Sequence, residues 1–377
     1  MKIWQIAVLE GDGVGREVMP VCLELLNAVA NKVGTFQFQF KHLEAGADLF
    51  QRTGEAFPDA TFQEAKSADA ILLGAMGIPE VRYPDGREIA PQLDLRERLG
   101  LFAGLRPIRS VQGVPEVLSH PLASKIDFVI IRESTEGLFA ARNSGENNSN
   151  DVAKDSLVIT RAACERLFHY AFRLARKRSR RGYPGKVTCV DKANVLSSYA
   201  FFRKIFKEIA EEYPDVKADY CYIDAMALNL VKIPWEFDVL VAENMFGDIL
   251  SDLGAALIGG MGMAPSGDIG ENHAVFQPCH GTAPDIIGKG MANPVAMLRS
   301  AAMMVEWLGE KAGIPEAHQA SRFIQLGIDK AFEGGELLPY ELGGTAGTRE
   351  IFDAIMEQLE ESKDVSDRSS RNGVFCS

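Results

Sequence analysis

Residues 238–254, with the sequence DVLVAENMFGDILSDLG, join a short apolar run to an amphipathic segment. The run at 238–244 has a continuously apolar centre at 239–242, which is typical of a strand buried on both faces of a parallel sheet. After it, apolar residues fall on one side of a helical wheel, with Asp248 and Asp252 at the edge of that side. The two acids stand four residues apart, about one helical turn, so both carboxylates would project from the same side. The stretch therefore predicts a strand followed by a helix that carries paired acids.

The same alternation of strand and helix continues through the chain. β-rich runs occur at residues 3–10, 69–77, 127–133, 186–194 and 219–224, and helical patterns occur at 161–179, 198–212 and 295–309. Apolar strands that alternate with amphipathic helices predict an α/β fold with a largely parallel sheet. A chain of 377 residues exceeds the usual size of a single core, so we expect two lobes.

The motif GDGVG at residues 11–15 follows a strand and opens a helix, as a dinucleotide-binding turn does. Its spacing is G-x-G-x-G rather than G-x-G-x-x-G, and no isolated acid ends a second strand some 20 residues later. The motif is better explained as a tight strand-to-helix turn that requires glycine. We therefore do not predict a Rossmann fold.

The composition excludes some classes of partner. The formal net charge is −12, from 40 basic and 52 acidic residues, which argues against a sequence-independent binder of nucleic acid or membrane surfaces. The six cysteines form no C-x-x-C pair and fit reduced thiols rather than a disulfide framework or zinc site. The N-terminus lacks a signal-peptide pattern, and the chain has no apolar run of 18 residues or more. We expect a soluble cytoplasmic protein, with an anionic small molecule still acceptable as substrate.

The paired acids at 248 and 252 have two explanations. Alone, they would mark the solvated edge of an amphipathic helix. A third acid, Asp224, ends the strand-like run at 219–224, and carboxylates are ligands that Mg²⁺ and Mn²⁺ prefer. Sequence spacing does not show whether Asp224 meets the other two.

Three arginines and one lysine lie in partly apolar surroundings. Arg96, Arg106 and Arg132 each offer a planar fork for a carboxylate, although any one of them could form a surface ion pair. Together they suggest a substrate with more than one carboxylate. Lys192 follows a buried-looking strand, where it could pair with Asp191 or serve as a base with a lowered pKa.

The segment PCHGTAPDIIGKGMANP at 278–294 combines glycines and prolines with His280, Thr282, Asp285 and Asn293. Backbone amides in such a loop can receive phosphates, and an acid can bind ribose hydroxyls. A turn-rich connection before the helix at 295–309 explains the same residues equally well.

In this order, these segments resemble the β-decarboxylating dehydrogenases, the family of 3-isopropylmalate, isocitrate, homoisocitrate and tartrate/D-malate dehydrogenases. The resemblance extends from GDGVG to LGGTAGT at 342–348, and VDKANVL, NMFGDILSDLGA and HGTAPDIIGKGMANP are its most specific motifs. It implies the two-lobed α/β fold of that family. One lobe would comprise residues 1–101 and 259–377, with the cofactor loop and a tail that is disordered from about 361. The inserted lobe, 102–258, would carry the metal site and a dimer arm at about 142–160.

The resemblance also implies a role for each candidate residue. The carboxylates of the substrate's malate part would bind Arg96, Arg106 and Arg132. Mg²⁺ or Mn²⁺ would be held by Asp224, Asp248 and Asp252. Lys192 would act in catalysis and, with Asp224, would reach the active site of the partner subunit in a homodimer. The dinucleotide would bind His280, Gly281, Thr282, Ala283, Asp285 and Asn293. The pair Asp285–Ile286 indicates NAD, because a carboxylate accepts from ribose hydroxyls and repels a 2′-phosphate.

Three positions depart from the family pattern. Phe139 stands where the family has a tyrosine that donates a proton, and phenylalanine has none to give. Gln277 replaces the usual glutamate before P-x-H-G. Gln92 and Leu93, which precede Arg96, match neither the leucine pair of isopropylmalate enzymes nor the serine-containing run of isocitrate enzymes.

The predicted activity is therefore NAD-dependent oxidative decarboxylation of a 3-substituted (2R)-malate, with 3-isopropylmalate as first choice. Tartrate/D-malate and homoisocitrate/isocitrate are the alternative substrates. A catalytically weakened regulatory paralogue is the non-enzymatic alternative that Phe139 leaves open.

Overall fold

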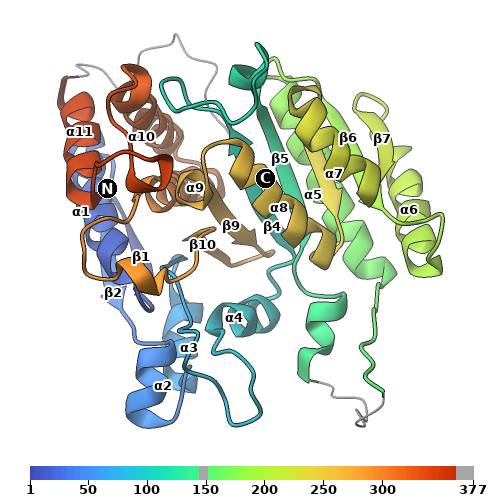
Figure 1. Cartoon of the computed structure of the whole chain (residues 1–377), viewed down its shortest axis with the longest axis horizontal. Helices are drawn as coiled ribbons and strands as arrows, with labels where there is room; N and C mark the ends of the chain where they lie inside the picture. The colour runs from blue at the N-terminus through green and yellow to red at the C-terminus, as the bar shows by residue number, and fades with distance from the viewer. Residues whose placement is uncertain (144–151, 362–377) are drawn as a thin grey trace.

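A ten-stranded mixed sheet runs through the whole chain in the computed structural model, which describes residues 1–143 and 152–361 (Figure 1). The strand order is β2-β1-β3-β10-β9-β4-β5-β8-β6-β7. The strands are β1 (Lys2–Leu9), β2 (Phe36–His42), β3 (Ala70–Leu73), β4 (Ala103–Arg109), β5 (Asp127–Glu133), β6 (Lys186–Asp191), β7 (Lys217–Tyr222), β8 (Val239–Ala242), β9 (Pro265–Ile269) and β10 (Ala274–Pro278).

Eleven α-helices connect or flank these strands in the described residues. They are α1 (Gly15–Val33), α2 (Ala47–Thr53), α3 (Asp59–Ser67), α4 (Pro91–Leu99), α5 (Arg161–Ser179), α6 (Ser197–Ala210), α7 (Ile223–Lys232), α8 (Asn244–Leu257), α9 (Val295–Ala312), α10 (Pro315–Glu333) and α11 (Thr348–Glu361). Short 3₁₀ turns include η2 (Leu138–Asn143) and η5 (Pro284–Ile286). Within residues 1–143 and 152–361, no helix is both long enough and apolar enough to cross a bilayer.

The predicted largely parallel sheet is confirmed at its two ends. β2, β1, β3 and β10 pair in parallel, and so do β5, β8, β6 and β7. The middle differs, because β9 pairs antiparallel with both β10 and β4, and β4 pairs antiparallel with β5. The five strands at one end come from residues 2–73 and 265–278, and the five at the other end from 103–242. We keep the division into lobes at 101/102 and 258/259 as a proposal that agrees with this order.

The core lies on both faces of the sheet because successive strand residues point to opposite sides. In β1, Ile6 and Val8 join the large cluster that also contains residues of α1, α9, α10 and α11. Ala7 and Leu9 face the other way and pack with residues of α3 and α4. At the other end of the sheet, α8 packs on β4 and β5, and α5 packs on β5, β8 and β6.

The GDGVG segment is a tight turn between β1 and α1, as its spacing suggested. Gly13 has φ 57°, and a Cβ there would lie 2.3 Å from the carbonyl oxygen of Thr282. The amide of Val14 donates to that same carbonyl at 3.0 Å. Glycine is therefore required because the loop after β10 lies directly against this turn.

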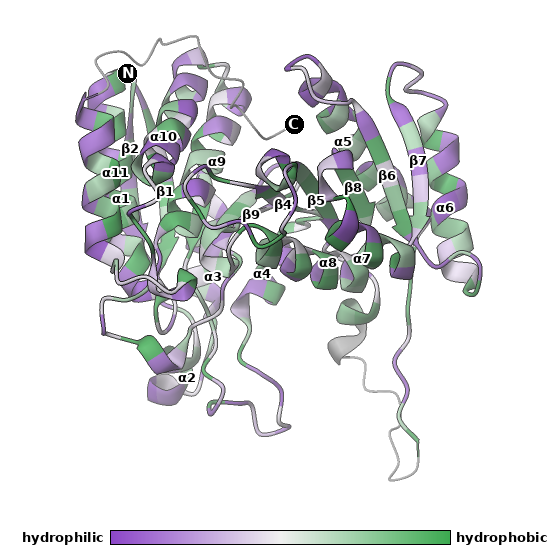
Figure 2. Cartoon of the chain, turned by 45° about the horizontal axis from the view of Figure 1, so that its top comes forward, coloured by the Kyte–Doolittle hydropathy of each residue, from purple (hydrophilic) through white to green (hydrophobic). Residues whose placement is uncertain are grey.

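Residues 152–160 form no helix or strand, are largely exposed, and extend away from the body of the chain (Figure 2). The rest of the predicted dimer arm, 144–151, lies outside the described residues, as do Cys376 and the tail beyond 361. The other five cysteines are free thiols, as expected for reduced cysteines.

Candidate active site

A cavity of about 290 Å³ opens at the middle of the sheet, where the antiparallel strands β10, β9, β4 and β5 meet. Helices α4 and α8 and the loop after β10 complete its wall. The predicted site residues that line it are Gln92, Leu93, Arg96, Arg106, Arg132, Phe139, Asp248, Asp252, Gln277, His280 and Gly281. Segments far apart in sequence thus form one pocket.

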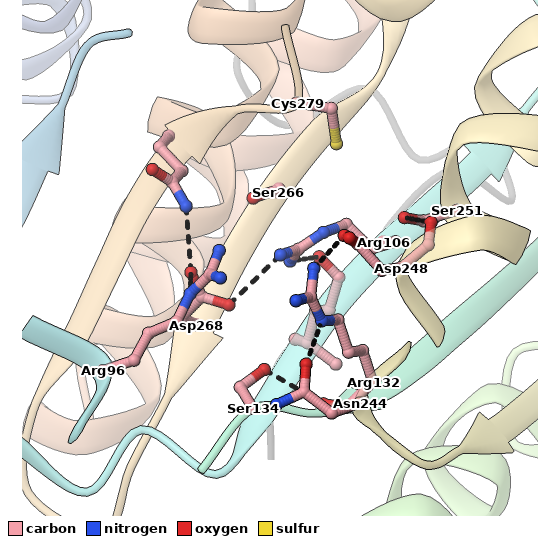
Figure 3. A network of polar contacts seen from close by, with 12 residues as sticks. Arg96, Arg106, Arg132, Ser134, Asn244, Asp248, Ser251, Ser266, Asp268 and Cys279 are labelled. Carbon is pink, nitrogen blue, oxygen red and sulfur yellow. Dashed lines mark hydrogen bonds and ion pairs between the residues drawn. The ribbon is translucent and has the colours of Figure 1, made fainter. Parts of the chain in front are cut away.

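The three predicted arginines converge there from three elements: Arg96 on α4, Arg106 on β4 and Arg132 on β5 (Figure 3). All three are buried, with at most 8% of each residue exposed. Burial, and then the charge of Arg96, lowers the pKa of Arg132 to about 10. Guanidinium groups held this close together and away from water stabilise a bound anion.

Arg132 is also fixed to α8. Its Nε donates to Asn244 Oδ1 at 2.8 Å, and its Nη1 pairs with Asp248. The ring of Phe139 lies over the guanidinium, with Arg132 Cζ 5.0 Å from the ring centroid. Phe139 therefore lines the pocket at an arginine, as an apolar wall without a transferable proton.

A fourth charged residue, Asp268 on β9, was not expected from the sequence. It is 1% exposed and accepts from Arg96 Nε at 3.0 Å and from Arg106 Nη2 at 3.3 Å. Gln277 Nε2 donates to Asp268 Oδ2, the same oxygen that accepts from Arg96, at 3.0 Å. Burial alone would raise the pKa of Asp268, but the charges of Arg96 and Arg106 outweigh burial and lower it. Asp268 is therefore an anion at the base of the arginine cluster.

The paired acids lie on α8 as predicted, on the side of the helix that faces the pocket. Burial, and then the charge of Asp248, raises the pKa of Asp252. Two carboxylates that repel each other at the rim of a cavity form a donor set that a divalent cation would stabilise.

Lys192 and Asp224 lie apart from this cavity in the described chain. They pair with each other at the β6–β7 edge of the sheet, and neither lines the pocket of its own chain. Asp224 sits in the first turn of α7, so the expectation that it ends a strand is wrong by two residues. The hydrogen bond from Lys192 lowers the pKa of Asp224. The structure thus brings two of the three predicted metal ligands together within one chain.

The predicted cofactor loop borders the same cavity. His280 Nδ1 lies 2.9 Å from the Gly281 carbonyl, and burial lowers the pKa of His280. Its Nε2 is buried without a hydrogen-bond partner in the described residues. Ala283 has φ 42°, a strained value for a residue with a side chain. Such strain in a loop is typical of ligand-binding segments.

The remaining loop residues differ in orientation. Thr282 is buried against the GDGVG turn, and Asp285 is exposed on η5. Asn293 is 7% exposed, and its Nδ2 donates to Glu341 at 2.7 Å while its Oδ1 accepts from the amide of Val295. Asn293 is therefore held within this chain by Glu341 and by the first residue of α9.

A family model described as isocitrate/isopropylmalate dehydrogenase matches residues 5–355. The chain belongs to this family. The 3-isopropylmalate/3-methylmalate dehydrogenase of Methanocaldococcus jannaschii is 40% identical over 360 residues, which cover 95% of this chain and 99% of that protein. The homoisocitrate dehydrogenase of the same organism is 38% identical, covering 94% of this chain and 97% of that protein. The crystal structure of isocitrate dehydrogenase from Methylococcus capsulatus matches with a TM-score of 0.80 and 34% identity, over 96% of this chain and all of that one.

Membership of the isocitrate/isopropylmalate dehydrogenase family confirms the predicted fold class and the resemblance to β-decarboxylating dehydrogenases. It makes the chain an oxidoreductase, which favours an enzyme over a regulatory paralogue. Several relatives at 37 to 40% identity are 3-isopropylmalate dehydrogenases, and they support the first-choice interpretation.

Proposed function

We propose that this protein catalyses the NAD-dependent oxidative decarboxylation of a 3-substituted (2R)-malate, with 3-isopropylmalate as first choice. One observation carries the proposal: three buried arginines face two acids of α8 across a single small cavity. Arginines bind the carboxylates of such an acid, and the aspartates bind the cation that its oxidation uses.

The metal proposed for the site is Mg²⁺ or Mn²⁺. Asp248 and Asp252 offer the oxygen ligands that these ions prefer. The pKa of Asp252 is raised first by burial and then by the charge of Asp248, and a bound cation would relieve both effects. We infer that Asp224 of a second copy completes the set. When bound, the ion would supply positive charge beside the oxygen of the newly formed carbonyl.

NAD is the proposed cofactor, and it would accept the hydride from C2. His280 and Gly281 line the same cavity as the arginines, which supports this role for the loop, and exposed Asp285 follows in the same loop. A free carboxylate there can accept from ribose hydroxyls and would repel a 2′-phosphate. We include Thr282, Ala283 and Asn293 in the binding loop, with Asn293 near the adenine.

A homodimer with shared active sites is part of the proposal. The exposed large apolar side chains around the Lys192–Asp224 pair are Val195, Leu196, Tyr222, Leu228, Val231, Ile233 and Ile249. Exposed large apolar side chains in such number are typical of a protein–protein interface. If two copies pair through it, each could supply Lys192 and Asp224 to the other's cavity, where Lys192 would take the C2 hydroxyl proton.

A specific observation supports one alternative substrate. Gln92 Oε1 is buried in the pocket wall without a hydrogen-bond partner in the described residues. Because a buried acceptor without a donor is costly, a C3 hydroxyl would satisfy it better than an isopropyl group. Tartrate is therefore our second candidate.

The test is to measure NADH and CO₂ formation with Mn²⁺ over a panel of (2R)-malates that carry isopropyl, methyl, hydroxyl, carboxymethyl or no substituent at C3. We expect oxidation of one or more of them, coupled to CO₂ release, and a preference for NAD over NADP. No turnover of any acid by protein that binds Mn²⁺ would refute the proposal.

A further inference from the structure

Asp268 is a buried anion that is held in place by the strand pairing of β9. β9, which carries it, is hydrogen-bonded to β10 on one side and β4 on the other, and Asp268 pairs in register with Val275 and Gly104. Its carboxylate accepts from three side chains of the cavity wall, Arg96, Arg106 and Gln277. A bound substrate would meet these arginines with Asp268 already in place (Figure 3).

We propose that Asp268 determines substrate specificity. Its carboxylate is a built-in counter-ion that neutralises the arginine charge with which a third substrate carboxylate would otherwise pair. The pocket is thereby matched to a dicarboxylic (2R)-malate whose C3 substituent carries no charge. This inference rests on the proposed function and names the class of substrate for the same site.

The charges around the cavity support this match. Arg96, Arg106 and Arg132 are balanced by the carboxylates of Asp248, Asp252 and Asp268. Glu88 also borders the cavity, but it is exposed, so water and salt screen its charge. Lys192 and Asp224 of a second copy would add one charge of each sign. A divalent cation then leaves a surplus of two positive charges, which a dicarboxylate neutralises and a tricarboxylate exceeds.

An excess charge in such a place is unfavourable because water is largely excluded. The arginines and Asp268 are all less than a tenth exposed. In surroundings of this kind one unit charge a few ångströms away changes the affinity for an ion by about ten- to a hundredfold. Removing the negative charge at position 268 should therefore change the preference between substrates that carry two and three carboxylates.

The contacts of Asp268 engage only part of the Arg96 guanidinium. It binds Arg96 through Nε alone, so the two Nη atoms of Arg96 take no part in this contact. Asparagine at 268 would keep an oxygen for Arg96 or Arg106 while removing the negative charge. The substitution Asp268→Asn thus removes the charge while nearly preserving the shape of the side chain.

The first experiment compares wild type with Asp268→Asn. The measurement is the ratio of kcat/KM for 3-isopropylmalate to kcat/KM for a (2R)-malate with a carboxyethyl group at C3. We expect wild type to favour the neutral substituent, and Asp268→Asn to shift the ratio towards the tricarboxylate by about tenfold or more. Asp329→Asn is the matched control, because Asp329 also accepts from two arginines, Arg109 and Arg299, but lies outside the cavity. It should leave the ratio unchanged.

A second variant tests the charge by moving it. Gln277 Nε2 already bonds Asp268 Oδ2, so Asp268→Asn with Gln277→Glu exchanges amide and carboxylate across the same hydrogen bond. The pocket regains its negative charge, and we expect the preference for the neutral substituent to return. A folded double variant that keeps the ratio of Asp268→Asn would contradict the charge argument.

A binding measurement keeps the inference separate from the proposed activity. Calorimetric titration of Mg²⁺-containing protein without NAD, with methylsuccinate and with tricarballylate, requires no turnover. Wild type should bind methylsuccinate more tightly than tricarballylate. Asp268→Asn should shift the ratio of the two dissociation constants in favour of tricarballylate by about tenfold or more. Equal losses for both acids would show that Asp268 only supports the arginines, and would overturn the inference. If no malate is oxidised while this shift is observed, the proposed function fails and the charge selection stands.

Discussion

The close approach of α8 to β5 at Gly247 gives a sharp prediction about the geometry of the pocket. A Cβ built on Gly247 would lie 2.7 Å from Cβ and 2.9 Å from Cα of Arg132. Carbon atoms in contact prefer about 3.5 Å, so Gly247→Ala must move α8 away from β5 by roughly 0.8 Å. Asp248 and Asn244, which hold Arg132, would move with the helix.

Two effects of opposite sign set the stability change for Gly247→Ala. Overpacking against backbone atoms costs about 1–3 kcal/mol. Alanine in place of glycine returns about 0.5–1 kcal/mol of helix stability. We expect a net loss of about 1–2 kcal/mol in the free energy of unfolding, measured by urea denaturation. A displacement approaching 1 Å at catalytic groups can reduce kcat/KM by about a hundredfold, measured with the best substrate of the panel.

Gly254→Ala, on the same helix, is the control for Gly247→Ala. The atoms nearest to a Cβ at Gly254 would all belong to the Ile108 side chain, the first two at 2.8 and 2.9 Å, and a side chain can adjust more cheaply than backbone. It should lose less stability and keep kcat/KM close to wild type. If Gly247→Ala proved as stable and as active as wild type, the claim that this contact fixes the pocket would be wrong.

Three further predictions concern the proton donor, a buried glutamate and the sharing of sites between subunits. If the missing hydroxyl at Phe139 limits the protonation step, Phe139→Tyr should raise the rate of CO₂ release on the true substrate; an unchanged rate means that protonation has another route. Burial outweighs Lys177 and Arg181 in raising the pKa of Glu306 above its ordinary 4.5. The native state therefore holds this proton to higher pH than the unfolded chain, and stability falls as pH rises from the unfolded to the folded pKa. Glu306→Gln should remove that fall, seen in urea melts over a pH series, whereas an identical pH slope would refute the assignment. If two copies share active sites, inactive Lys192→Ala and Arg106→Gln variants should regain activity when refolded together, because a mixed dimer has one complete site, and no recovery from dimers shown to have mixed would contradict shared sites.

The alternation of strands and helices could be read from the sequence because those strands are apolar on both faces. The antiparallel middle of the sheet could not. β9 has the sequence PSGDI, and proline, glycine and aspartate are depleted in strands. Its place is set by pairing with β10 and with β4, which lies more than 150 residues earlier in the chain. Tertiary pairing therefore overrides local propensity at the strand that carries Asp268.

Part of the candidate site could likewise be predicted from the sequence, and part could not. The acids on α8 and the three arginines stand in recognisable surroundings, and the structure brings them together. The meeting of Asp224 and Lys192 with this pocket depends on a second copy, so a single sequence or chain leaves it a proposal. Asp268 could not be recognised because a lone acid beside glycine and serine usually indicates a turn.

The structure gives a physical reason for the amide at Gln277, which departs from the family pattern. In the sequence it was an unexplained amide at a position where the family resemblance leads us to expect a glutamate. In the structure it donates to Asp268, so the amide is the correct partner for a buried carboxylate, and a glutamate there would place two negative charges 3.0 Å apart. Positions 268 and 277 should therefore be treated as one unit that holds a single negative charge beside the arginines. Which of the two carries that charge decides how far it lies from Arg96 and Arg106, and so how much positive charge remains for the substrate.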